Sequence, residues 1–334
     1  MAVNETLSTY SDMAYATSVV LYIFAMLLYF GEFAYKRSAK PAAAAQREPE
    51  LVGAGTGSGG GSDVGRVETP VKRPLAERLG GMAVAITVLG GVVHALSLIA
   101  RGVSTGRAPW GNMYEFGSAI CLAAVVAWLV VLFRQSRKVH RDTSAVQLRA
   151  LGGFLMLPVT LLLFLSGTLL YAEASQLQPA LQSYWIVIHV SAAIVSTGAL
   201  LLAGVASLLF LVRLRHERQP EKMAAVGSRL PSSTALDRVA YRATVIIFPV
   251  WTFAIVAGAI WAEAAWGRFW GWDPKETCSF IAWIVYAAYL HARATAGWRG
   301  VPSAWINVAG LAVMIFNLFF INIVVAGLHS YSGL

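Results

Sequence analysis

The chain has 334 residues, of which 57% are hydrophobic and only 13% are charged. This composition excludes an ordinary soluble domain and predicts several helices that cross a lipid bilayer. A formal net charge of +9 would suggest nucleic acid in a soluble protein. Here we expect membrane lipid and no nucleic acid, and the positive charges indicate which loops lie in the cytoplasm.

Eight apolar segments predict an all-α, polytopic membrane protein with about eight transmembrane helices. The expected spans are Met13–Tyr35, Leu79–Ala100, Met113–Phe133, Leu148–Tyr171, Tyr184–Val212, Val239–Ala262, Thr277–Thr295 and Ser303–Leu328. With both termini on the outer face, the cytoplasmic segments hold 22 of the 26 Lys and Arg residues. This asymmetry predicts that orientation in the plasma membrane.

The chain is expected to have three parts. Residues 1–36 form an N-terminal transmembrane anchor, because no basic segment precedes the first span and no small-residue cleavage site follows it. Residues 37–78 are rich in Ala, Gly and Pro, which predicts a disordered cytoplasmic linker. Residues 79–334 hold the other seven helices and are interpreted as the functional domain.

The expected outer loop after the second span combines aromatic and charged residues. It runs into Pro109-Trp110-Gly111-Asn112-Met113-Tyr114-Glu115 and contains Arg101 and Arg107. A Trp is typical of the membrane–water boundary, and arginines pair well with ligand carboxylates. Ordinary anchoring of two helix ends is the alternative for Trp110 and both arginines.

The six histidines form two groups. Two lie among Lys and Arg in expected cytoplasmic loops and should be solvated, namely His140 and His216. The others lie in or at the ends of spans: His94, His189, His291 and His329. An imidazole within lipid needs a partner and suits iron. A satisfied hydrogen bond between helices is the alternative for any one of them.

Depth along the helices separates the four membrane histidines. His189 lies ~7 Å below the outer edge at 1.5 Å per residue, and His329 emerges on the same side. These two are expected to bind one planar macrocycle from its two faces. His291 lies ~22 Å beyond the outer end of its span and belongs to an inner site, whereas His94, ~10 Å deep, fits neither level.

The polar and aromatic stretch before the seventh span is the most distinctive in the chain. It reads Trp266-Gly267-Arg268-Phe269-Trp270-Gly271-Trp272-Asp273-Pro274-Lys275-Glu276, with three tryptophans in seven residues. Such a cluster offers a face for a large planar ligand. An interfacial aromatic belt is the alternative, but a belt does not require the residues that follow Trp272.

The pattern W-G-x-x-W-x-W-D-x-x-E resembles the tryptophan-rich WWD signature of haem-handling membrane proteins in cytochrome c assembly. Its continuation, DPKET, is most similar to the CcsA/ResC branch, the channel-like subunit of the two-component System II cytochrome c synthase. The segment from Pro109 to Glu115 is similar to that family's P-x-x-N-x-Y-E. The likeness runs from about Ala83 to the C-terminus.

The resemblance implies haem b as the transported ligand. It implies that His189 and His329 bind the iron at the outer face, and that His291 binds haem within the membrane with a companion residue from a ResB/Ccs1-like partner protein. The tryptophans would hold the porphyrin plane, while the polar residues order the loop or bind propionates: Trp266, Trp270, Trp272, Asp273, Lys275 and Glu276. No family role transfers to His94.

The expected function is haem delivery and presentation to the Cys-x-x-Cys-His motif of apocytochrome c, where thioether bonds form. No nucleophile–base arrangement is evident, so we expect a subunit of a cytochrome c synthase that works by positioning. Cys121 and Cys278 lie in apolar spans without a CxxC motif, so thiol reduction would fall to another protein.

Two alternatives are a haem-containing electron-transfer subunit and a transporter without haem. The first would pair histidines on facing helices and has no use for the Trp-rich stretch. The second would show helices broken near the midplane, for which Pro158 and Pro249 are candidates.

Overall fold

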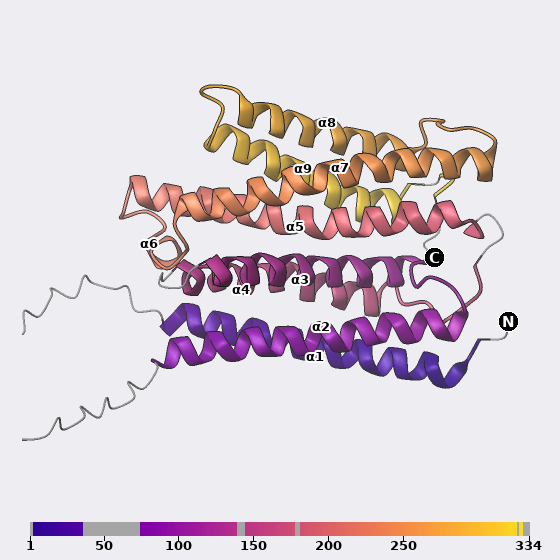
Figure 1. Cartoon of the computed structure of the whole chain (residues 1–334), viewed down its shortest axis with the longest axis horizontal. Helices are drawn as coiled ribbons and strands as arrows, with labels where there is room; N and C mark the ends of the chain where they lie inside the picture. Colours follow the sequence, from indigo (N-terminus) through magenta and orange to yellow (C-terminus); the bar gives the residue numbers. More distant parts are fainter. Residues whose placement is uncertain (1–2, 36–73, 139–143, 178–180, 326, 330–334) are drawn as a thin grey trace, which may run out of the picture.

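The structure is a computed structural model that describes residues 3–35, 74–138, 144–177, 181–325 and 327–329. All the regular structure in these ranges is helical (Figure 1). The helices are α1 (Glu5–Tyr35), α2 (Leu75–Thr105), α3 (Met113–Lys138), α4 (Ser144–Thr168), α5 (Tyr184–Arg218), α6 (Ala224–Gly227), α7 (Ser233–Trp266), α8 (Pro274–Ala294) and α9 (Val301–Ile323). Most of the predicted linker, and His140, lie outside the described residues.

Every expected span is found as a helix, and the prediction of an all-α, polytopic membrane protein is confirmed. Among the described helices, seven are long and apolar enough to cross a membrane: α1, α2, α3, α4, α5, α7 and α9. The eighth, α8, has 21 residues with charged or titratable side chains in its end turns. It packs on α9 and runs along the same bundle (Figure 1).

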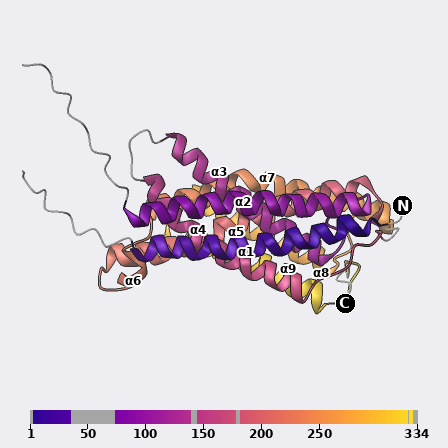
Figure 2. The same cartoon turned by 90° about the horizontal axis from the view of Figure 1, so that it is seen from below.

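The long helices run along one common direction (Figures 1 and 2). α1 packs on α2 and α4, α3 packs on α4 and α5, and α5 packs on α7 and α9. α4 and α7 continue without a break through Pro158 and Pro249. The bundle therefore has an α1–α4 part and an α7–α9 part, with α5 between them.

α1 and α2 meet along a seam in which buried residues recur at alternating spacings of three and four. On α1 the seam residues are Ser11, Tyr15, Ser18, Tyr22, Ala25, Tyr29 and Glu32. On α2 they are Gly80, Ala83, Thr87, Gly90, His94, Ser97, Arg101 and Ser104. This is the heptad spacing of a coiled coil. A Cβ at Gly90 would lie 2.8 Å from Cε1 of Tyr22, so the two helices approach closely because Gly90 has no side chain.

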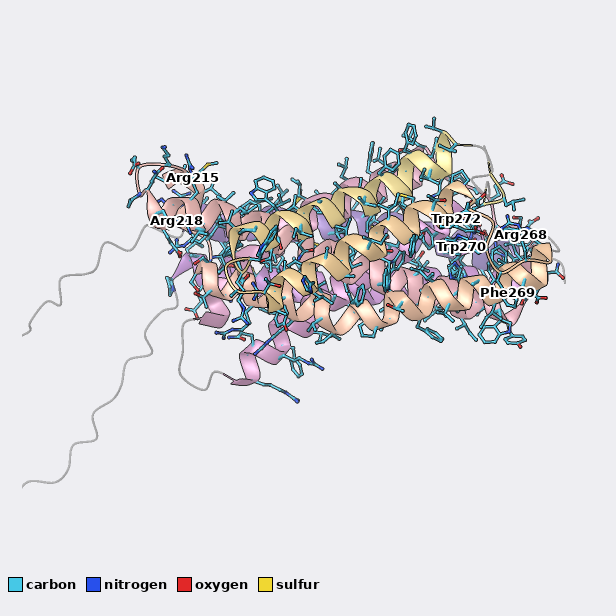
Figure 3. All side chains as sticks on the ribbon, turned by 90° about the horizontal axis from the view of Figure 1, so that it is seen from above. Arg215, Arg218, Arg268, Phe269, Trp270 and Trp272 are labelled. Atoms are coloured by element: carbon cyan, nitrogen blue, oxygen red, sulfur yellow. The ribbon has the colours of Figure 1, made fainter. Side chains whose placement is uncertain are left out.

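The two ends of the bundle differ in chemistry. Figure 3 shows Arg215 and Arg218 at one end, and Arg268, Trp270 and Trp272 at the other. Both ends of the described chain lie at the Trp-rich end. There Asn4 N–H donates to the Ser104 carbonyl at 2.9 Å, and His329 contacts Asp273. This is the arrangement expected of an even number of spans.

Candidate functional site

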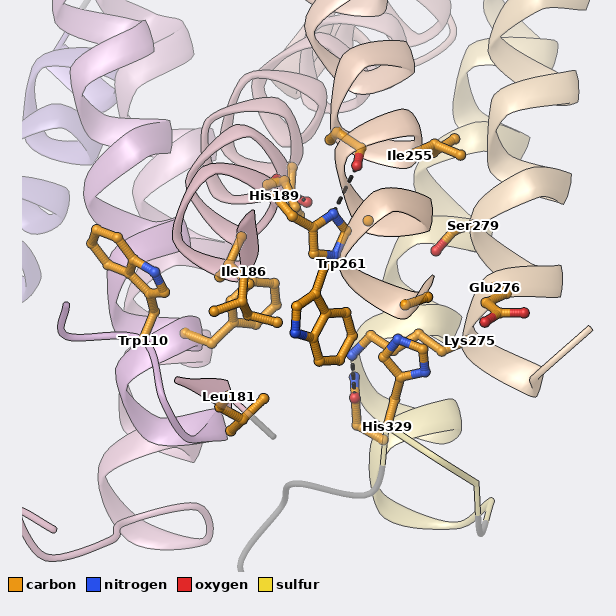
Figure 4. A pocket seen from close by; sticks show the side chains of 18 of the residues that line it. Trp110, Leu181, Ile186, His189, Ile255, Trp261, Lys275, Glu276, Ser279 and His329 are labelled. Atoms are coloured by element: carbon orange, nitrogen blue, oxygen red, sulfur yellow. Dashed lines mark hydrogen bonds between the residues drawn. The ribbon is translucent and has the colours of Figure 1, made fainter. Parts of the chain in front are cut away.

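A cavity lies at the Trp-rich end of the bundle, between α3, α5, α7, α8 and α9 (Figure 4). Its wall is mostly apolar and aromatic. Six of the residues predicted from the sequence line it: Trp110, His189, Trp270, Lys275, Glu276 and His329. Three other predicted residues of the Trp-rich stretch do not line the cavity: Trp266, Trp272 and Asp273. The two outer histidines are thus brought to one cavity, from α5 and from the segment after α9.

His189 lies in the second turn of α5, which begins at an N-cap formed by Ser183. Its Nδ1 donates a hydrogen bond to the carbonyl of Ala254 on α7, at 2.7 Å. This bond fixes the tautomer, so Nε2 is the nitrogen suited to bind a metal. The ring fits against α7 because residue 258 is glycine, where a Cβ would lie 2.7 Å from both Cε1 and Nδ1 of His189.

His329 is held by Asp273, whose Oδ1 accepts a hydrogen bond from Nδ1 at 2.8 Å. The same carboxylate accepts the N–H of Leu328 at 2.8 Å and the N–H of Lys275 at 3.1 Å. Burial alone would raise the pKa of Asp273, but hydrogen bonds from His329 and from these two N–H groups lower it from 3.8 to about 2. Asp273 is therefore an anion at neutral pH, and it orients His329.

The residues that follow Trp272 form the start of α8. Asp273 is the N-cap, Pro274 occupies the first helical turn, and Glu276 completes a capping box. Oε2 of Glu276 accepts the N–H of Asp273 at 3.1 Å and that of Gly271 at 2.9 Å. Physically, the Asp-Pro-Lys-Glu sequence anchors the loop to a helix end, so that Asp273 can face His329.

The three tryptophans of the stretch occupy three different environments. The ring centroid of Trp266 lies 5.0 Å from that of His329, with the rings nearly perpendicular. Trp270 lines the cavity. Trp272 has a positive φ of 59°, is 66% exposed, and meets Trp270 edge-on at 5.8 Å. They do not share one flat face; Trp270 is the member that offers a surface to a ligand in the cavity.

Trp261 on α7 is a site residue that the sequence interpretation missed. Its buried indole lies between the two histidines (Figure 4). The centroid distances are 6.4 Å to His189, with parallel rings, and 5.9 Å to His329. Trp261 precedes the Trp-rich stretch by more than one helical turn and looks like an ordinary core residue. Only the packing of α5 against α7 reveals its place.

Trp110 lines the cavity together with Gly111, Asn112 and Met113 of the same segment, whereas Arg101 and Arg107 do not. The two arginines beside it are bound to Glu115, which is fully buried. Arg101 Nε lies 3.0 Å from Oε1 of Glu115, and Arg107 Nη1 lies 2.7 Å from Oε2. Arg101 also contacts Asp12 at 3.5 Å. The charges of this group are mutually compensated, and the cluster joins α1, α2 and α3.

The other two membrane histidines lie away from the cavity. His94 is fully buried in the α1–α2 seam. Its Nε2 lies 2.8 Å from Oγ of Ser118, and its Nδ1 lies 3.3 Å from the hydroxyl of Tyr22. His291 is exposed on the last turn of α8, ~22 Å along the helix from Glu276.

Comparisons with known proteins cover nearly all of this site. A family model described as cytochrome C assembly protein matches residues 110–329. The chain is 34% identical over 264 residues to the cytochrome c biogenesis protein CcsA of Chlamydomonas reinhardtii, covering 77% of this chain and 70% of that protein. It is 33% identical to CcsA of Gloeobacter violaceus (78% and 88% covered) and 32% identical to CcsA of Porphyra purpurea (78% and 90%). The matched region contains both cavity histidines.

Proposed function

This chain belongs to the cytochrome c assembly protein family, and we propose that it binds haem b in the cavity and presents it to apocytochrome c. Family membership gives a role in cytochrome c biogenesis to this multi-pass membrane protein. We place the cavity on the extracytoplasmic side of the plasma membrane, because the Lys/Arg asymmetry favours that orientation. As part of a synthase, the chain would act by positioning haem.

The observation that carries the proposal is the pair of histidines at one cavity. His189 and His329 come from segments far apart in sequence, and each has its Nδ1 held by an oxygen acceptor. An Nδ1 held in this way is typical of metal-binding histidines, since it orients the ring and raises the basicity of Nε2. The apolar, aromatic wall suits a porphyrin, and the two imidazoles suit its iron.

Haem entry requires a movement of Trp261. Metal–imidazole bonds are about 2 Å long, so His189 and His329 would hold one iron only with their Nε2 atoms close to it. The indole of Trp261 lies between the two rings in this structure. It would have to turn aside for His189 and His329 to share one iron, and it could then contribute to the cavity wall together with Trp270.

The imidazoles of His189 and His329 would hold and shield the iron until apocytochrome c arrives. Each cysteine thiol of its Cys-x-x-Cys-His motif adds across one haem vinyl group, so that an S–C bond and a C–H bond form and nothing is released. The histidine of the motif then replaces one of the two ligands. His189 and His329 would hold the haem by its iron and the cavity wall would fix its orientation, so that the vinyl groups stay in place for this step, which is catalysis by orientation.

His291 is proposed as a ligand of a second, inner haem site. It lies near the opposite end of α8 from the cavity, and its side chain is exposed on the outside of the bundle. An exposed histidine can share a haem with a residue of another protein. This position therefore supports a ResB/Ccs1-like membrane protein as the partner.

No observation favours the alternatives. α4 and α7 continue through Pro158 and Pro249, so the helices are not broken where a non-haem transporter was expected to break them. The Trp-rich loop contacts both the cavity and His329, whereas an electron-transfer subunit has no need of such a loop.

The test is the absorption spectrum of the purified protein and of three variants. The wild type should contain haem with a bis-imidazole spectrum, while His189→Ala and His329→Ala should lose that spectrum and fail to support cytochrome c maturation. Added imidazole should restore part of it by filling the vacated position. His216→Ala, at the other end of the bundle, is the matched control. Normal maturation by both cavity variants would reject the proposal.

A further inference from the structure

A second cavity lies at the end of the bundle opposite the Trp-rich loop, between the start of α2, the end of α3 and the start of α4. It holds about 630 Å³, within the range of ~300–1,000 Å³ that is usual for ligand sites. Its wall is apolar except for Ser136 and Arg149. Four of its apolar side chains are 43–55% exposed, so the cavity is a groove that opens to the outside of the bundle: Val88, Val126, Val130 and Phe133.

The groove has the length of one leaflet of a bilayer. Along α3 its lining residues run from Val126 to Ser136, which is ~15 Å at 1.5 Å per residue. The hydrocarbon core of a membrane is ~30 Å thick, so the groove covers about half of it. Figure 2 shows the last turns of α3 standing away from the other helices. The groove therefore has room for an acyl chain that enters at this end of the bundle.

The mouth of the groove, where α3 ends, is basic. Arg134 and Arg137 follow Phe133 in the last turns of α3, and both side chains are exposed. The guanidinium carbon of Arg137 lies 4.3 Å from the ring centroid of Phe133, which places this charge beside the groove. Within the described ranges, neither arginine has a carboxylate at ion-pair distance. Both guanidinium groups are available to an anion.

The other charges near the mouth do not cancel this excess. Arg149 lines the groove, but its Nη2 lies 3.1 Å from Oε1 of the buried Glu32, so this charge is already compensated. Glu77, in the first turn of α2, lies one turn before Gly81 and on the same face of the helix. It is one anion against the two free arginines of α3. The described residues around the mouth thus carry more positive than negative charge.

Basic pockets between transmembrane helices are a known means of binding anionic lipid headgroups. We infer that this groove binds one anionic phospholipid, with an acyl chain along Val88 and Val130 and its phosphate at Arg134 and Arg137. The apolar wall accepts any lipid chain, whereas the guanidinium groups select a negative headgroup because they bind phosphate oxygens through paired hydrogen bonds. Only the assignment to the cytoplasmic leaflet rests on the orientation proposed above.

The test measures which phospholipid stays bound to the purified full-length protein. The protein is incubated in mixed micelles with equal amounts of phosphatidylglycerol and phosphatidylcholine, and native mass spectrometry counts the lipids that are retained. The wild type should retain one phosphatidylglycerol in preference to phosphatidylcholine by about tenfold, the size expected for an excess of one to two basic residues. Equal retention of the two lipids would reject the anionic site and indicate an adventitious lipid only.

Arg134→Gln/Arg137→Gln removes the two free charges, so this double variant should lose the preference and retain both lipids equally. Arg215→Gln/Arg218→Gln is the matched control, because it removes two exposed arginines at the same end of the bundle (Figure 3) that do not line the groove. An unchanged preference in the first variant, or an equal loss in the control, would overturn the assignment of the phosphate to α3.

Val130→Trp places a large side chain where the acyl chain should lie. Binding within a lipid or detergent phase depends on packing contacts, so this variant should retain about fivefold less of both lipids. Val256→Trp is its control, since Val256 is 52% exposed on α7 and does not line the groove. Full retention in Val130→Trp would reject the groove. Haem content is expected to be unchanged in all four variants, and its absence from the wild type would reject the proposed function without affecting the lipid measurement.

Discussion

The seam between α1 and α2 and the cavity at the Trp-rich end each contain a histidine, and the two side chains are held differently. His94 in the seam contacts a neighbouring hydroxyl with each of its ring nitrogens. His189 is fixed through Nδ1 alone and turns toward a cavity. Both histidines lie in helices long and apolar enough to cross the membrane, His94 fully buried and His189 partly buried. The second ring nitrogen decides which histidine can bind a ligand.

Two glycines test this comparison most strongly, because each makes room for an aromatic side chain on a facing helix. Gly258→Ala places a methyl group against the ring of His189. Displacing a packed group costs up to about 3 kcal/mol, so haem affinity should fall about 100-fold. The measurement is haem titration of the purified variant.

Gly90→Ala should lower the stability of the protein and leave haem binding unchanged, since its methyl group would meet Tyr22 in the seam. We expect a loss of about 1–3 kcal/mol of stability with an unchanged haem spectrum. Gly81→Ala is the control for both, because nothing lies within 4 Å of a Cβ there. Equal haem loss in the Gly90 and Gly258 variants would mean that the two regions are not separable.

Replacing Asp273 with Asn should have the next largest effect. The substitution keeps an oxygen for the N-cap and removes the charge that orients His329, and such changes behind a metal ligand commonly cost 10–100-fold. We expect about a tenfold loss of haem affinity, at the lower end of that range. Wild-type affinity with the Asn variant would show that the charge is dispensable.

The charge of the Asp273 carboxylate also determines the pH range over which it stabilises the site. Its pKa is lowered on folding, so its stabilising contribution is complete above its usual pKa of 3.8 and is lost as the pH falls toward about 2. Haem retention should therefore show no step due to Asp273 between pH 5 and pH 8. A step in that range that is absent from Asp273→Asn would contradict this assignment.

A smaller difference is expected between two tryptophans of the same loop. Trp270→Ala removes part of the cavity wall and should weaken haem binding about fivefold, the size of a modest aromatic contact. Trp272→Ala should change it little, because that side chain is mostly exposed and does not line the cavity. Haem content per folded protein measures both. An equal loss in the two variants would favour a shared platform over separate roles.

The smallest effect on haem is predicted for His94→Gln. Glutamine can still bond Ser118 or Tyr22 but loses the ring contacts with Tyr15 and Tyr22. Thermal stability should fall by about 1 kcal/mol, with the haem spectrum unchanged. A changed haem spectrum would indicate that His94 binds the haem iron.

The sequence was sufficient to predict the helices and the common depth of His189 and His329, because apolar length and a fixed rise per residue determine both. It did not indicate which faces of the helices meet. Trp261 and Gly258 belong to the site only because α7 packs on α5, and Asn317 and Asn322 line its cavity only because α9 packs on α8. The asparagines had a detectable signal, polar groups in an apolar run, whereas Trp261 and Gly258 had none. The predicted ligand roles themselves stay predictions.

The α1–α2 seam also brings the end of α1 close to the start of α2, so the segment that connects these two helices has only a short distance to cross. A Cβ at Gly80 would collide with the carboxylate of Glu32, and one at Gly31 would lie 3.4 Å from Leu79. The chain thus leaves the bundle and re-enters it at nearly the same place. When the ends of a loop already adjoin, each doubling of its length costs only about 0.6 kcal/mol in closure entropy. The bundle therefore places little constraint on the length of residues 36–73, and a much shorter or longer insert there should be compatible with the same packing.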